Sequence, residues 1–149
     1  MTSEELWNEF CAWSGEDPEQ AHEAWAFGGD PDGLAELVLR GRKTATASLK
    51  LLYQIEQEPL PRAGEFSVIT DGAGEAVCVI RTTRVYAVPF RDVGPAQAFR
   101  EGESDRSLRA WREIHRSFFA EELAPYHRAF DESMEVICEE FQPVYAAER

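Results

Sequence analysis

The chain has 149 residues, of which 44% are hydrophobic and 29% charged, so it suits one folded domain and is too apolar for a disordered or collagen-like chain. Its formal net charge of −13 disfavours a polyanionic partner unless the charges are segregated. No apolar run approaches the roughly 18 residues that a membrane span needs, and the N-terminus lacks the basic region of a secretory signal, which predicts a cytoplasmic protein.

The N-terminal part of the chain is acidic, and its capping and apolar residues predict a helix. Residues 1–36 hold ten acids and no Lys or Arg, whereas residues 40–116 hold thirteen bases against ten acids. Ser3 is the expected N-cap of a first amphipathic helix, in which Leu6, Phe10 and Trp13 follow at helical spacing before Gly15.

Two more helix starts follow, each an Asp cap with a Pro in the first turn. One predicted helix runs over residues 17–25 toward the Gly28-Gly29 break. The next begins at Asp30-Pro31 and ends at Gly41, and its apolar face consists of Leu34, Leu37 and Val38.

The middle of the chain combines an ambiguous segment with a clear hairpin. Residues 43–58 mix strand-forming threonines with helix-forming Ala and Leu, and we expect a helix from about Ala45. After a loop over residues 59–64, the β run 66–69 turns at residues 71–74 into a strand over residues 76–88.

The last third predicts two helices and a strand. A short helix over residues 95–100 ends at Gly102, a longer one runs from about Ser107 to Leu123, and a strand covers residues 134–141. In the longer helix Leu108, Trp111, Ile114 and Phe118 form one face. Helices around a few strands, with the last strand far from the hairpin that it must join, predict an α+β fold, a small, partly open mixed β-barrel flanked by helices.

The sequence around Lys43 is the strongest candidate site. Lys43 and Lys50 are the only lysines of the chain, and a lysine, unlike an arginine, can lose its proton and act as a base. If a helical turn follows Gly41, Lys43 and Thr46 share a face, and a desolvated amine could take the hydroxyl proton; in a strand they would lie on opposite faces. The alternative is a helix C-terminus with solvated cations.

A second candidate is the loop that carries Glu101, Glu103 and Asp105. Such a loop can present carboxylates for acid–base chemistry or simply cap helices, and capping is the expected role of Asp105. Glu101 ends a predicted helix, where only a cation such as Lys43 or a substrate amine would favour a carboxylate. The three acids could attract Mg²⁺ or Mn²⁺ weakly, but no histidines or cysteines have ligand spacing, so we expect no metal site and no cofactor.

Two further patterns are ambiguous. Trp111 and His115 lie one helical turn apart, and they could stack a base or belong to the core. In the last strand Glu139 and Glu140 lie on opposite faces, so one glutamate shares a face with apolar residues and could point inward.

An ordered set of segments resembles the ASCH domain family, in its longer bacterial branch. The segments are Trp25-Ala26-Phe27-Gly28, Gly41-Arg42-Lys43-Thr44-Ala45-Thr46, Pro61-Arg62-Ala63-Gly64-Glu65, Phe90-Arg91-Asp92-Val93, Glu101-Gly102-Glu103-Ser104-Asp105, Trp111-Arg112-Glu113-Ile114-His115 and Cys138-Glu139-Glu140-Phe141. The resemblance covers about residues 25–145 and implies a PUA-like β-barrel flanked by helices. We therefore expect a single domain over residues 1–149 with an acidic helical N-terminal extension over about residues 1–24.

The resemblance also implies a chemistry, because some ASCH proteins are amidohydrolases that remove acyl groups from N4-acylated cytidine with a lysine, a threonine and a glutamate. By this resemblance the three residues correspond to Lys43, Thr46 and Glu101. The Lys43 amine would act as the base, the Thr46 hydroxyl as the nucleophile, and the Glu101 carboxylate would contact the substrate. The expected substrate-binding residues are Arg42, Thr44, Asp105, Trp111 and His115. One departure is Ser48, which stands where small members often have an arginine.

Two alternatives remain open: a non-catalytic RNA-binding module in translation regulation, and a metal-dependent ribonuclease that uses Glu101, Glu103 and Asp105. The acidic total favours a small modified nucleoside over a long RNA, because each phosphate contact needs a cation. We expect no DNA partner.

Overall fold

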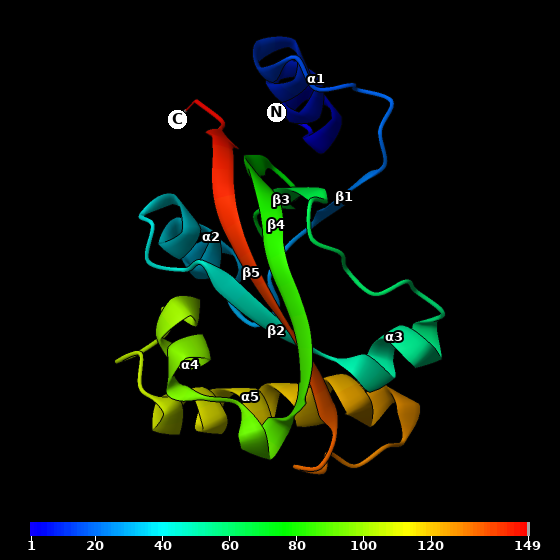
Figure 1. The fold of residues 1–149 in the computed structure, drawn as a ribbon, viewed down its shortest axis with the longest axis vertical. Helices are drawn as coiled ribbons and strands as arrows, with labels where there is room; N and C mark the ends of the chain where they lie inside the picture. The colour runs from blue at the N-terminus through cyan, green and yellow to red at the C-terminus, as the bar shows by residue number, and fades with distance from the viewer. Residues whose placement is uncertain (149) are drawn as a thin grey trace.

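The computed structural model describes residues 1–148, and these residues form five helices around one five-stranded sheet (Figure 1). The helices are α1 (Ser3–Ser14), α2 (Pro31–Leu39), α3 (Lys50–Glu56), α4 (Pro95–Glu101) and α5 (Leu108–Leu123). The strands are β1 (His22–Trp25), β2 (Ala45–Leu49), β3 (Phe66–Thr70), β4 (Ala76–Pro89) and β5 (Glu135–Ala146). Short 3₁₀ turns cover Phe90–Asp92 and Ala124–Tyr126.

The sheet has the strand order β1-β3-β4-β5-β2. β1 runs parallel to β3, and the other neighbours are antiparallel. Among the described residues β1 and β2 are the two edges and do not pair with each other, so the sheet is not closed. The expected mixed fold, a partly open barrel flanked by helices, is confirmed.

Local sequence signals account for several elements. The Asp30 side chain accepts a hydrogen bond from the Gly33 amide and Pro31 follows it, so α2 begins where its cap predicts. The β3–β4 hairpin forms as predicted, and α4 ends at Gly102, whose φ of 76° is the left-handed conformation that glycine adopts without strain.

Two predicted helices are wrong, because pairing with distant strands overrides local propensity. The segment 17–25 is a turn followed by β1, which pairs with β3 over residues 66–69. The helix expected from Ala45 is instead β2, which pairs with β5 over residues 136–140, and α3 begins only at Lys50.

Smaller differences concern element ends and faces. Thr2, not Ser3, caps α1, in a capping box with Glu5, and Trp13 is exposed. β5 continues past Pro143, at a place where the register with β4 shifts and a missing amide donor is tolerated. The buried face of α5 differs from the expected one and consists of Trp111, His115, Phe119 and Leu123.

The helices gather at two ends of the sheet. Helix α1 packs at one end, near both chain termini, whereas α3, α4 and α5 lie at the other (Figure 1). Helix α2 packs through Ala35 and Val38 against Ile69, Ile80 and Phe141. No helix of residues 1–148 is long and apolar enough to cross a membrane.

Candidate active site

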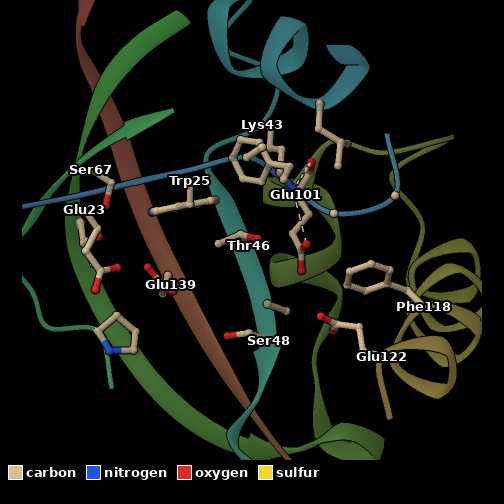
Figure 2. Close-up of a pocket in the computed structure, with 18 of the residues that line it drawn as sticks. Glu23, Trp25, Lys43, Thr46, Ser48, Ser67, Glu101, Phe118, Glu122 and Glu139 are labelled. Atoms are coloured by element: carbon tan, nitrogen blue, oxygen red, sulfur yellow. Dashed lines mark hydrogen bonds and ion pairs between the residues drawn. The ribbon is translucent and has the colours of Figure 1, made fainter. Parts of the chain in front are cut away.

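A cavity of about 860 Å³ lies over one face of the sheet (Figure 2). All five strands contribute side chains to it: Glu23 and Trp25, Thr46 and Ser48, Ser67, Thr82, and Glu139. Helix α5 covers it with His115 and Phe118, and the loops at residues 26–30 and 59–62 complete its wall. The volume is in the range of pockets that bind small molecules, roughly 300–1,000 Å³.

Strand alternation gives this cavity a polar floor. In β2, Ala45, Ala47 and Leu49 are buried, and the residues between them, Thr46 and Ser48, line the cavity. Thr46 lies directly opposite Glu139 of β5 in the ladder, so both side chains project from the same face.

Lys43 and Thr46 line the same cavity although Thr46 is in a strand. Alternation would place them on opposite faces only if the strand included both residues, but β2 begins at Ala45. The irregular backbone at residues 43–44 lets the Lys43 side chain turn into the cavity.

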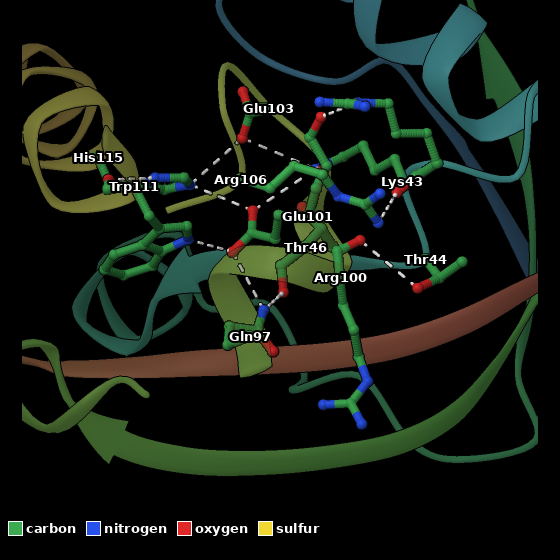
Figure 3. Close-up of polar contacts among 12 residues, drawn as sticks. Lys43, Thr44, Thr46, Gln97, Arg100, Glu101, Glu103, Arg106, Trp111 and His115 are labelled. Atoms are coloured by element: carbon green, nitrogen blue, oxygen red, sulfur yellow. Dashed lines mark hydrogen bonds and ion pairs between the residues drawn. The ribbon is translucent and has the colours of Figure 1, made fainter. Parts of the chain in front are cut away.

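The Lys43 amine is buried in a cluster of charged groups (Figure 3). Lys43 is 1% exposed, and its Nζ lies 3.5 Å from Glu101 Oε1, 3.4 Å from the Glu101 carbonyl oxygen and 3.9 Å from Glu103 Oε2. It also lies over the ring of Phe27 at 5.2 Å. The amine is therefore almost fully buried and has two carboxylates as neighbours.

Glu101 holds this cluster together, and its four side-chain neighbours occupy both oxygens. Oε1 faces Lys43 Nζ and, at 3.2 Å, His115 Nε2, whereas Oε2 accepts hydrogen bonds from Gln97 at 3.1 Å and from the Trp111 indole. Burial alone would raise the pKa of Glu101, but Lys43, His115 and Trp111 stabilise the carboxylate and lower its pKa to about 2.

The surroundings of His115 favour its protonated form. Its Nδ1 lies 2.9 Å from the Trp111 carbonyl oxygen, which can only accept, so this nitrogen carries a proton. Its Nε2 faces the Glu101 carboxylate and must also donate. Burial opposes the charge, but Glu101 and Glu103 outweigh it and raise the pKa of the ring.

Glu103 is the carboxyl group of the cluster that is open to the cavity. Its Oε2 lies 3.9 Å from both Lys43 Nζ and His115 Nε2, and its side chain is 18% exposed. Burial and the nearby Glu101 raise its pKa, although Lys43 and His115 oppose the shift.

The same groups do not fit a divalent cation well. One ligand atom each of Glu101, Glu103 and His115 lies within 4.8 Å of the others, but the Lys43 ammonium already contacts both carboxylates and would repel the metal. Asp105, the third acid of the alternative ribonuclease site, is not in this group.

Arg42 and Thr44 fix the loop that carries the glutamates. Arg42 donates to the carbonyl oxygens of Gly102 at 2.7 Å and Ser104 at 2.9 Å, and the Thr44 amide donates to the Arg100 carbonyl oxygen at 2.7 Å. A Cβ at Gly102 would lie 2.4 Å from the Arg42 carbonyl oxygen, so only glycine fits this approach.

The expected site residues thus divide into two groups. The cavity is lined by Lys43, Thr46, Glu101 and His115. Arg42, Thr44, Asp105 and Trp111 lie outside its lining. Of these, Trp111 is buried behind Glu101, where its ring stacks on His115 at 4.2 Å, and Asp105 is exposed and accepts from the Ser107 amide at 2.9 Å.

Sequence reasoning missed much of the cavity floor. Glu23 and Trp25 lie on β1, for which the sequence predicts a helix, and Ser67 lies opposite Glu23 on β3. Tyr53 of α3 also lines the cavity and is hydrogen-bonded to Ser48 at 2.7 Å. The inward-pointing glutamate of the last strand is Glu139, whereas Glu140 pairs with Arg84 and Arg100.

The fold and the cavity define a class: a mixed α/β domain whose open sheet forms the polar floor of a cavity. The ASCH domain model matches residues 23–145, and the chain belongs to the ASCH domain family. The resemblance seen in the sequence is thereby confirmed.

Solved structures agree with this assignment. An ASCH domain from Lactobacillus crispatus JV V101 is 33% identical, with a TM-score of 0.89 over 96% of this chain and 94% of that one. A protein from Enterococcus faecalis V583 is 36% identical, with a TM-score of 0.89 over 97% of this chain and 88% of that one. No match was found among curated proteins.

Proposed function

We propose that this chain is an amidohydrolase that removes the acyl group from N4-acylated cytidine or a related modified nucleoside. The observation that carries the proposal is the convergence of Lys43, Thr46 and Glu101 on one cavity, from three different parts of the chain. The family to which the chain belongs has members with this activity, and its lysine, threonine and glutamate fall on these residues.

Thr46 is the proposed nucleophile. Its Oγ1 attacks the acyl carbon, the C–N bond breaks, and the acyl group forms an ester with Thr46 that water then hydrolyses. Lys43 takes the hydroxyl proton during the attack and gives it to the leaving amine, so protons balance over the step.

To act as a base, the Lys43 amine must first lose its own proton. Glu103 lies 3.9 Å away, faces the cavity and has a raised pKa, so it is suited to accept that proton when a bound ligand displaces water from the site. Glu101 has four donors around its carboxylate and no free position for a substrate. We therefore assign Glu101 to the positioning of Lys43 rather than to the substrate.

The charges of the site support a small neutral or cationic substrate over an RNA chain. Lys43 is buried, and Arg42 is hydrogen-bonded to the loop at residues 102–104, so neither is free for phosphates. On α5, Arg109 lies 3.5 Å from Glu113, and Arg116 is paired with Glu132.

The direct test is the release of cytidine from N4-acetylcytidine by purified protein. Wild type should release cytidine, and Thr46→Ala should reduce the rate at least about 100-fold. Thr83→Ala is the matched control, because Thr83 is an exposed threonine outside the cavity lining. No release by wild type, or equal rates for wild type and Thr46→Ala, would reject the proposal.

A further inference from the structure

The cavity has a second group of polar side chains away from the Lys43 cluster. Glu23 of β1 lies opposite Ser67 of β3 in the ladder, and Glu139 of β5 projects into the same space (Figure 2). Glu65, which directly precedes β3, also lines the cavity. We call Glu23, Glu65, Ser67 and Glu139 the carboxylate floor.

Two members of the carboxylate floor, Ser67 and Glu139, are largely buried and line the cavity. Ser67 is 9% exposed, and its hydroxyl has no hydrogen-bond partner among residues 1–148. Glu139 is 8% exposed and, among the same residues, forms no ion pair; its polar neighbour is the Thr82 hydroxyl. No fully buried side-chain oxygen or nitrogen of the described residues lacks a hydrogen-bond partner, so the Ser67 hydroxyl is open to the cavity. A ligand there can hydrogen-bond to this hydroxyl and compensate the charge of Glu139, whose burial costs free energy.

The repulsion among the carboxyl groups points to the charge of that ligand. Burial, together with the smaller effect of the negative charges of Glu65 and Glu23, raises the pKa of Glu139 to about 7. The cavity wall holds few lysine or arginine side chains: Lys43, which is already paired with Glu101 and Glu103, and Arg62. The carboxyl groups of the wall are Glu23, Asp30, Glu65, Glu101, Glu103, Glu121, Glu122 and Glu139.

We propose that the carboxylate floor binds an aliphatic ammonium group, so that the substrate is an acylated nucleoside whose acyl chain carries an amine. This inference rests on the proposed function, whose substrate it specifies. The ammonium group supplies the missing positive charge to Glu139 and Glu23, and Ser67 Oγ accepts one of its protons in a hydrogen bond.

The distances within the sheet set the length of the acyl chain. Thr46 and Glu139 are directly opposed in an antiparallel pair, in which Cβ atoms lie about 5 Å apart. An acyl carbon at Thr46 therefore brings an amine two or three bonds further along to Glu139. Trp25, which lines the same side of the cavity, offers a ring face to the charge (Figure 2).

The test compares two substrates of equal size, N4-(3-aminopropanoyl)cytidine and N4-butanoylcytidine, which differ in an ammonium against a methyl group. We expect kcat/KM to favour the aminopropanoyl compound by about tenfold or more at low salt. Glu139→Gln, and separately Glu23→Gln, should bring the ratio of the two compounds close to one. Glu4→Gln removes an exposed carboxylate from α1 and should retain the preference.

Binding of both compounds to Thr46→Ala, measured by calorimetry, separates this inference from the proposed function. Tighter binding of the aminopropanoyl compound supports the carboxylate floor, even if wild type hydrolyses neither compound and the hydrolase proposal fails. Hydrolysis and binding that do not distinguish the two compounds would overturn the inference, as would a preference that survives both Glu139→Gln and Glu23→Gln in correctly folded protein.

Discussion

Lys43 has two distinct properties, a positive charge and the capacity to exchange a proton. The structure shows the use of the first, and the proposed mechanism requires the second. Glu101 and Glu103 hold the amine in place by charge, whereas the proposed mechanism needs a proton transfer with Thr46. Arginine keeps the charge but stays protonated at any relevant pH, so the two properties can be separated by one substitution.

Lys43→Arg should therefore lower kcat for N4-acetylcytidine by at least about 100-fold, since proton transfer by a positioned side chain contributes roughly 10²–10⁴-fold. The measurement is steady-state kinetics on protein whose fold is verified by circular dichroism. If Lys43→Arg keeps activity within a few-fold of wild type, Lys43 acts through its charge alone and the proton-transfer role is wrong.

The arrangement of secondary-structure elements forms the site by bringing the loop after α4 close to the segment that precedes β2. The loop after α4 passes the backbone of Arg42 at Gly102, and this approach carries Glu101 and Glu103 to Lys43. Gly102 is therefore under two constraints: a φ of 76° and the lack of space for a Cβ.

Gly102→Ala should destabilise the protein by roughly 2 kcal/mol or more, from conformational strain and from the clash with the Arg42 carbonyl oxygen. The matched control is Gly74→Ala, because Gly74 has a φ of 84° but no atom within 4 Å of the place that a Cβ would take. Urea denaturation should give a clearly larger loss for Gly102→Ala. Equal losses for both variants would contradict a requirement for the close approach.

The elements that sequence predicts correctly are those whose signals are local. The Asp30-Pro31 start of α2, the turn at residues 71–74 and the stop at Gly102 each fix a boundary within a few residues. β1 and β2 have no such signal, because their partner residues lie 44 residues away for β1 and 87 to 95 residues away for β2. Short segments such as His-Glu-Ala-Trp of β1 and Ala-Thr-Ala-Ser-Leu of β2 become strands only when a partner strand is present.

The site residues also divide into those with a local sequence signal and those that only long-range strand pairing brings together. The family resemblance identifies Lys43, Thr46 and Glu101, and the place of Glu101 at a helix end predicts its pairing with a cation. Glu23 and Ser67 could not be found, because they meet only through the parallel β1–β3 pairing. The sequence offers Glu139 as one of two candidates, and only the register against Thr46 assigns it to the cavity.

The buried carboxyl group of Glu139 couples the stability of the protein to pH. The pKa of Glu139 is raised from 4.5 to about 7, so between these values the folded protein binds more protons than the unfolded chain. Stability from this group is fully present below about pH 4.5 and is lost as pH rises through about 7, with a total loss of about 3 kcal/mol.

Glu139→Gln removes this titration. Between pH 4.5 and 8 the free energy of unfolding of wild type should therefore fall relative to that of Glu139→Gln, as measured by urea denaturation at a series of pH values. Glu4→Gln, on the exposed face of α1, should follow wild type. A difference between wild type and Glu139→Gln that stays constant over this range would show that Glu139 titrates normally.

The proposed reaction depends on the attack of Thr46 on the acyl group, in the cavity that Lys43 also lines. Rapid quenching of the reaction with N4-acetylcytidine, followed by peptide mass spectrometry, tests it most directly. We expect a peptide heavier by one acetyl group, with the group on Thr46 in wild type and absent from Lys43→Arg. Turnover without any acylated Thr46 at early times, or an acetyl group on a different residue, would contradict it.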